Sequence, residues 1–143
     1  QTYVIDDAEL ERVRKSYPVI WKDPDAKPKL CFIGCPHLTF SQLNDWTDRL
    51  EQKLKSAGRK KVAIRTVFTT APAVLEKFRK TERYERLRAM GVVLSYICPL
   101  MYMNNPMCAK MPVITNSNKL RTYTTSRYYS DSEILDQITG GAK

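Results

Sequence analysis

The stretch that decides the fold is Leu30-Cys31-Phe32-Ile33-Gly34-Cys35-Pro36-His37. Its apolar first half predicts a buried strand, and its second half predicts a corner that leads into a helical segment. Chemistry in parallel α/β sheets collects at the carboxyl ends of strands. A thiol and the chain's single histidine lie at this corner, so it is the first candidate site.

Strands and helices alternate on the carboxyl side of this stretch. Capping residues and apolar stripes predict a helix that starts at Thr39 and stops at Gly58, a helix that breaks near Thr81, and a last helix that starts at Ser130. β-branched and apolar runs predict three further strands, at Lys61–Val67, Val92–Ile97 and Met111–Thr115. The alternation predicts an α/β fold with a mostly parallel sheet of about four strands flanked by helices.

The remaining segments give weaker signals. Asp6 predicts the start of a short first helix with an apolar stripe. The stretch 21–28 is rich in turn formers and predicts a surface connection. Val92–Ile97 is apolar throughout, as expected of a strand covered on both faces. Leu100–Lys110 predicts an irregular loop over a site.

The length and composition suit a single soluble domain. The 143 residues, 43% apolar and 27% charged, can bury a real core, and no apolar run reaches the ~20 residues of a membrane span. No secretory signal is visible, so we expect the four cysteines to be thiols or metal ligands in the cytoplasm. The chain starts at Gln1 rather than Met, and we expect a fragment of a longer protein.

The formal charge of +9 admits an anionic partner such as nucleic acid. Nine of the 24 lysines and arginines, however, fall in the two helical segments Asp45–Ser56 and Ala73–Met90, where they alternate with Glu and Asp as on a solvated helix face. The sequence therefore does not favour nucleic-acid binding.

Cys35 and His37, Cys98, and the pair Asn116 and Ser117 each follow a different predicted strand. The carboxyl ends of parallel strands share one edge, so we expect these side chains to lie together. Cys31 precedes Cys35 by four residues of extended strand, roughly 13 Å, so the two sulfur atoms are too far apart to bind one metal ion. We therefore expect Cys31 to be a core residue. Cys108 reads as structural.

The residues alone leave several functions open. Two thiols at one edge could serve zinc, an iron–sulfur cluster or a redox pair, or they could simply be buried. Cys35 could also be a nucleophile with His37 as its base. The segment Asn116-Ser117-Asn118-Lys119 either starts a helix or uses its amides and Lys119 to bind a carboxylate or phosphate.

Three motifs in order carry a family resemblance. Gly34-Cys35-Pro36-His37, then Cys98-Pro99, then Thr115-Asn116-Ser117-Asn118-Lys119 resemble the carboxyl-terminal part of the large subunit or domain of aconitase X. Members of that family are iron–sulfur dehydratases, among them cis-3-hydroxy-L-proline dehydratases and archaeal mevalonate 5-phosphate dehydratases. The resemblance covers most of the chain and implies an aconitase-like domain.

The resemblance also implies roles for individual residues. Cys35 and Cys98 would be two ligands of an iron–sulfur cluster, with the third cysteine in a part of the large subunit outside this chain. Asn116, Ser117 and Lys119 would orient a small hydroxy-acid substrate, and His37 would donate a proton to the leaving hydroxide. A small swivelling subunit or domain would supply a catalytic serine. The competing interpretations are a non-enzymatic zinc- or anion-binding module and a nucleic-acid binder.

Overall fold

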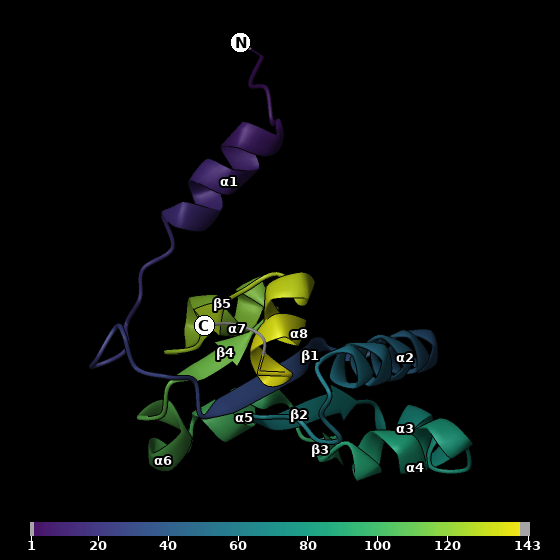
Figure 1. The fold of residues 1–143 in the computed structure, drawn as a ribbon. Helices are drawn as coiled ribbons and strands as arrows, with labels where there is room; N and C mark the ends of the chain where they lie inside the picture. Colours follow the sequence, from purple (N-terminus) through teal and green to yellow (C-terminus); the bar gives the residue numbers. More distant parts are fainter. Residues whose placement is uncertain (1, 141–143) are drawn as a thin grey trace.

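The computed structural model describes residues 2–140, which build a five-stranded sheet in the order β3-β2-β1-β4-β5 (Figure 1). Every neighbouring pair of strands is parallel. The α/β fold with a mostly parallel sheet is thus confirmed, with one strand more than expected. The strands are β1 (Leu30–Leu38), β2 (Arg65–Thr70), β3 (Val92–Ser95), β4 (Val113–Thr115) and β5 (Arg127–Tyr128).

Helices cover both faces of the sheet, as a parallel sheet requires. One apolar core joins the sheet to α2 (Phe40–Ser56), α3 (Pro72–Phe78), α4 (Glu82–Ala89) and α8 (Asp131–Ile138). The core on the opposite face includes side chains of α5 (Pro99–Met103), α6 (Pro106–Ala109) and α7 (Asn118–Tyr123). Helix α1 (Asp7–Lys15) stands away from the sheet and buries no residue (Figure 1).

The helix signals in the sequence are confirmed at their starts. Thr39 and Gln42 form a reciprocal capping box at α2, and Ser130 and Glu133 form another at α8. Thr81 caps α4 and so separates it from α3. The predicted apolar stripe of α2 is buried throughout, at Leu43, Trp46, Leu50 and Leu54.

Three expectations about the strands and loops were wrong. The second strand begins at Arg65 rather than Lys61 and runs on to Thr70. β3 is not covered on both faces, because it is the edge strand of the sheet and Val93 is 52% exposed. The apolar run of β3 does not reveal its place in the strand order. The stretch 100–110 forms α5 and α6 instead of a loop, since prolines fit the first turn of each helix.

The amino-terminal segment also departs from expectation. Trp21 is buried rather than on a surface connection, and its indole Nε1 donates to the carbonyl oxygen of Thr125 at 2.9 Å. The apolar residues of α1, Leu10 and Val13, are exposed. Among residues 2–140 no helix combines the length and the apolar character that crossing a membrane demands.

Candidate functional site

The Gly34–His37 corner is a bulge inside β1 rather than a turn after it. Ile33 pairs with Phe68 and Leu38 with Thr70, so β1 uses more residues than β2 over the same length. A regular strand would place Cys35 on the same face as Cys31 and Ile33. Instead, Cys35 belongs to the apolar core on the other face of the sheet. The bulge therefore separates the two cysteines and gives Cys35 its own environment.

Glycine is required where the bulge begins. Gly34 has a φ of +113°, and a Cβ there would lie 2.3 Å from the carbonyl oxygen of Thr69 and 2.6 Å from its hydroxyl. Thr69 Oγ1 donates to the Gly34 carbonyl at 2.6 Å, and Thr70 Oγ1 donates to the Leu38 carbonyl at 2.6 Å. Two fully buried threonines of β2 thus fix both ends of the bulge.

Thr69→Val is expected to lower the free energy of unfolding by about 1–3 kcal/mol, because it leaves the Gly34 carbonyl without its buried partner. Urea unfolding measures the change, and Thr69→Ser should recover most of it. The control is Thr66→Val on the same strand, whose hydroxyl donates to the part-buried carbonyl of Ile64, where water can replace it. An equal loss in Thr69→Val and Thr66→Val would contradict this role for Thr69.

Cys35 and His37 differ in burial within the bulge. Cys35 is buried, and its peptide bond to the exposed Pro36 is cis. His37 is half-buried, and its Nε2 atom is inaccessible and has no hydrogen-bond partner in the described chain. Buried polar atoms are nearly always paired, so this nitrogen is an exception that marks the bulge as a candidate site.

Cys98 follows β3 and immediately precedes α5, with Pro99 as the first helical residue. Helix α5 contacts β1 and α7. Tyr102 holds α5 against the sheet. Its ring stacks on that of Phe32 with the ring centroids 5.3 Å apart, and its hydroxyl shares a 3.0 Å hydrogen bond with the hydroxyl of Ser95. Cys98 and Cys35 therefore lie at the same edge, as predicted, on strands separated by β2.

The predicted substrate-binding residues lie after β4, at the same edge. Asn116 Nδ2 donates to Asp131 Oδ1 at 2.8 Å. Ser117 is buried and its hydroxyl accepts the amide of Leu120 at 3.0 Å, which is a helix cap. Lys119 is exposed. Asn116 and Ser117 thus have structural partners, and the binding roles of all three residues stay predictions.

The other two cysteines lie apart from this arrangement. Cys31 is completely buried in the core under α2, and burial raises the pKa of its thiol. It is the inert core residue that the sequence indicated. Cys108 on α6 is half-buried against the second apolar core. Within residues 2–140 no three His, Cys, Asp or Glu side chains come close enough together to hold a metal ion.

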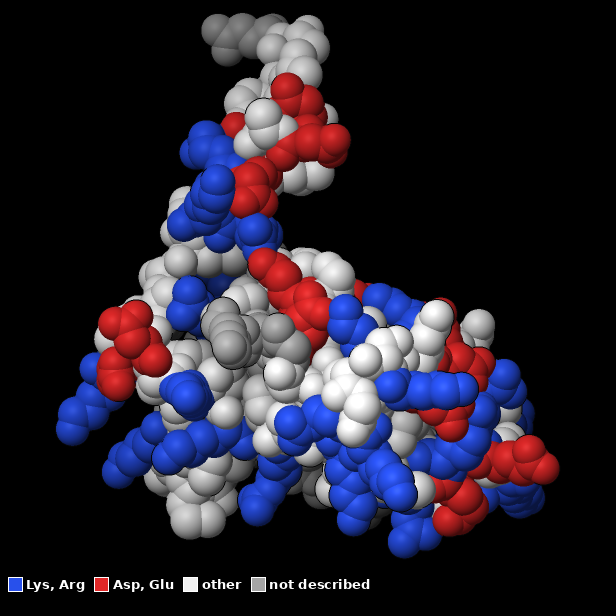
Figure 2. Space-filling view, in the orientation of Figure 1, with Lys and Arg blue, Asp and Glu red and all other residues white. Residues whose placement is uncertain are grey.

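Ion pairs link the charged side chains of α2 and α4. Asp48 of α2 pairs with Arg83 and Arg86 of α4, and Glu51 also pairs with Arg86. These partners hold the pKa of Asp48 below its ordinary value, mainly through the hydrogen bond from Arg83. Figure 2 shows acidic and basic side chains side by side toward the α2 and α4 end. The predicted solvated, mixed-charge helix faces are confirmed.

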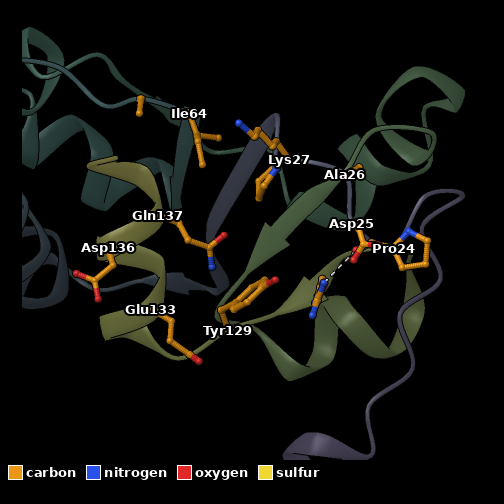
Figure 3. A pocket seen from close by; sticks show the side chains of 12 residues that line it. Pro24, Asp25, Ala26, Lys27, Ile64, Tyr129, Glu133, Asp136 and Gln137 are labelled. Carbon is orange, nitrogen blue, oxygen red and sulfur yellow. Dashed lines mark hydrogen bonds between the residues drawn. The ribbon is translucent and has the colours of Figure 1, made fainter. Parts of the chain in front are cut away.

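A cavity of about 980 Å³ lies away from the candidate residues. It is lined by segments that precede β1 and β2, together with α8 and Tyr129, so it opens at the amino-terminal edge of the sheet (Figure 3). Two of its three acidic residues have ion-pair partners, because Glu133 pairs with Arg14 and Asp136 with Lys53. We assign it no part in the chemistry of Cys35 and Cys98.

A family model described as the aconitase X third domain matches residues 28–136. This chain belongs to the aconitase X family. The match includes the Gly34–His37 bulge, the Cys98 helix start and the Asn116–Lys119 segment, so all the candidate residues fall within the family domain. The resemblance drawn from three motifs is confirmed at the level of the family.

Solved structures show the same fold. The chain superposes on the structure described as the holo-form of Thermococcus kodakaraensis aconitase X with a TM-score of 0.69 and 20% sequence identity. The alignment covers 94% of this chain and 33% of the Thermococcus chain, so this chain spans about a third of that protein's length. Comparison with curated protein sequences gives no match.

Proposed function

We propose that this chain is one domain of an iron–sulfur hydro-lyase of the aconitase X family and that Cys35 and Cys98 are two ligands of its cluster. The observation that carries the proposal is that an aconitase X third domain brings two cysteines, from β1 and from the start of α5, to one edge of its sheet. Residues 1–143 would form a single α/β domain of a longer large subunit. Cytoplasmic location stays a prediction.

The residues present fit a cluster that is only partly held by this chain. Thiolates are the ligands that iron–sulfur clusters prefer, and His37, two residues after Cys35, has a buried Nε2 atom with no partner among residues 2–140. The described residues offer no three-ligand group, so in this proposal the third cysteine would come from elsewhere in the enzyme. When bound, a cluster iron with an open position supplies Lewis acidity toward the leaving hydroxyl of the substrate.

The chain's own residues would then bind and orient the substrate. Lys119 is exposed and offers a positive charge to a carboxylate or phosphate, and Asn116 and Ser117 border the same edge. His37 would hold the proton that the departing hydroxide takes up. The apolar core around Cys35 would keep water from that side of the cluster.

The proposed substrate is cis-3-hydroxy-L-proline or a related hydroxy acid. A mevalonate 5-phosphate dehydratase is the second candidate, because Lys119 would serve a phosphate as well as a carboxylate. The small swivelling subunit or domain of the family is the proposed partner and the proposed source of the catalytic serine. Neither the family match nor the paired surface charges favours a zinc module or a nucleic-acid binder.

Metal analysis of the complete protein, purified without oxygen, tests the proposal. We expect iron and acid-labile sulfide in stoichiometric amounts, little zinc, and dehydration of one of the two candidate substrates. Stoichiometric zinc without sulfide would show instead that the two thiols belong to a structural metal module. Dehydration of mevalonate 5-phosphate alone would decide for the second substrate.

His37→Ala in the complete enzyme is expected to lower turnover by about 10²–10⁴-fold while the cluster stays bound, because the change removes a proton donor and no ligand. Initial rates, together with iron content in the same preparations, measure the effect. Lys119→Ala should mainly raise KM and so separates binding from proton transfer. Full turnover in His37→Ala would remove the histidine from the mechanism.

A further inference from the structure

An apolar surface surrounds Cys98 on the outside of the domain. Tyr96 and Ile97, which precede the cysteine, are 59% and 41% exposed, and Met101, one helical turn after it, is 63% exposed. The amide of Met101 donates to the carbonyl of Cys98 at 2.9 Å, so Met101 lies in the first turn of the helix that Cys98 starts. Val93, 52% exposed, continues the surface along β3.

The same stretch lacks charge. Residues 92–103 contain no Lys, Arg, His, Asp or Glu, although 27% of the chain is charged. β3 is also an edge strand and has no neighbour on its outer side within the described chain. Exposed apolar patches of this kind mark protein interaction sites. An open aqueous surface or a phosphate backbone would favour charged residues here.

We infer that the surface of Val93, Tyr96, Ile97 and Met101 is the docking face for the part of the same enzyme that supplies the third cluster ligand. This inference rests on the proposed function. Its occupant is an apolar protein segment, because the face offers no charge. The aligned Thermococcus aconitase X has about two thirds of its chain outside the region that this chain covers, which leaves ample polypeptide to cover the face.

The face lies next to Cys98, where a third cluster ligand would have to approach. A third ligand must approach the cluster from outside this domain, and Cys98 is the more exposed of the two cysteines. Cys35 is already covered by its own apolar core. A segment docked on Tyr96, Ile97 and Met101 would bring its ligand to Cys98 and exclude water from the open side of the cluster.

Methionine oxidation in the complete protein tests the docking face without any substitution. Met101 on α5 and Met107 on α6 have similar exposure in this domain, 63% and 70%, but α6 leads into the amino-terminal end of β4, at the opposite edge. Under dilute peroxide, followed by peptide mass spectrometry, we expect Met101 to oxidise about tenfold or more slowly than Met107. Equal rates would overturn the inference.

A charge placed on the face gives an independent readout. Met101→Lys in the complete protein should release iron faster in the presence of a chelator, whereas Met107→Lys should behave as the wild type. Unchanged iron release in Met101→Lys would count against the inference. Protection of Met101 that disappears on dilution would identify a second copy of the chain as the occupant and would also overturn it.

The cluster assignment and the docking face can be tested separately. A wild-type protein that contains no iron would defeat the proposed function, and the oxidation pattern of Met101 and Met107 would still decide whether the face is covered. Stoichiometric iron with rapid oxidation of Met101 would leave the cluster assignment standing and reject the docking face.

Discussion

Gly34→Ala is expected to lower the free energy of unfolding by about 3 kcal/mol or more, enough to leave much of the protein unfolded. The added Cβ would meet the Thr69 backbone oxygen at 2.3 Å, and a φ of +113° is strained for any residue with a side chain. Relief would require β1 and β2 to separate at the bulge that sets the position of Cys35.

Gly58→Ala is the matched control for this change. Gly58 has a φ of +64°, and no atom of the described residues 2–140 lies within 4 Å of the position its Cβ would take. Only the left-handed conformation opposes the alanine, at a cost of about 1–2 kcal/mol. Urea unfolding of both variants compares the two effects, and similar losses would show that close packing at Thr69 does not fix the bulge.

The second large effect is expected for Cys35→Ala and Cys98→Ala in the complete enzyme. Each should reduce bound iron by about tenfold or more and abolish dehydration, since even the loss of residues that merely orient metal ligands costs about 10–100-fold in affinity. Visible absorbance of the cluster and iron per chain, measured after purification without oxygen, report the result.

Cys31→Ala and Cys108→Ala are the controls for the cysteine variants. Cys31 is buried in the core on the other side of the sheet, and Cys108 lies on α6. Both variants should keep their bound iron. Cys31→Ala is also expected to lower the free energy of unfolding somewhat, because it leaves a cavity in the core. If Cys108→Ala loses iron and Cys98→Ala keeps it, the ligand assignment is wrong.

The parallel sheet and its shared edge could be predicted because they follow from local patterns. Alternating strands and helices impose the topology, and the capping residues Thr39 and Ser130 mark helix starts whatever the tertiary context. The same reasoning correctly placed Cys35 and Cys98 at one edge and Cys31 in the core.

The features that could not be predicted depend on long-range contacts. The bulge at Gly34 depends on a hydrogen bond from the Thr69 hydroxyl on the neighbouring strand, and this contact cannot be read from the sequence around either residue. The exposed side of β3 follows from strand order, which an apolar run does not encode. β5, Arg127–Tyr128, is two residues long, too short for an alternating pattern to reveal it. Gly34 and Pro36 are the local signs of an irregular strand, because both residue types mark bulges within sheets.

The most direct test of the cluster assignment is an anomalous-scattering map at the iron edge, from crystals of the complete protein prepared without oxygen. The account predicts iron density bonded to the sulfur atoms of both Cys35 and Cys98, with a third sulfur from a segment outside this chain. Iron density bonded to neither cysteine, in crystals that contain stoichiometric iron, would contradict it.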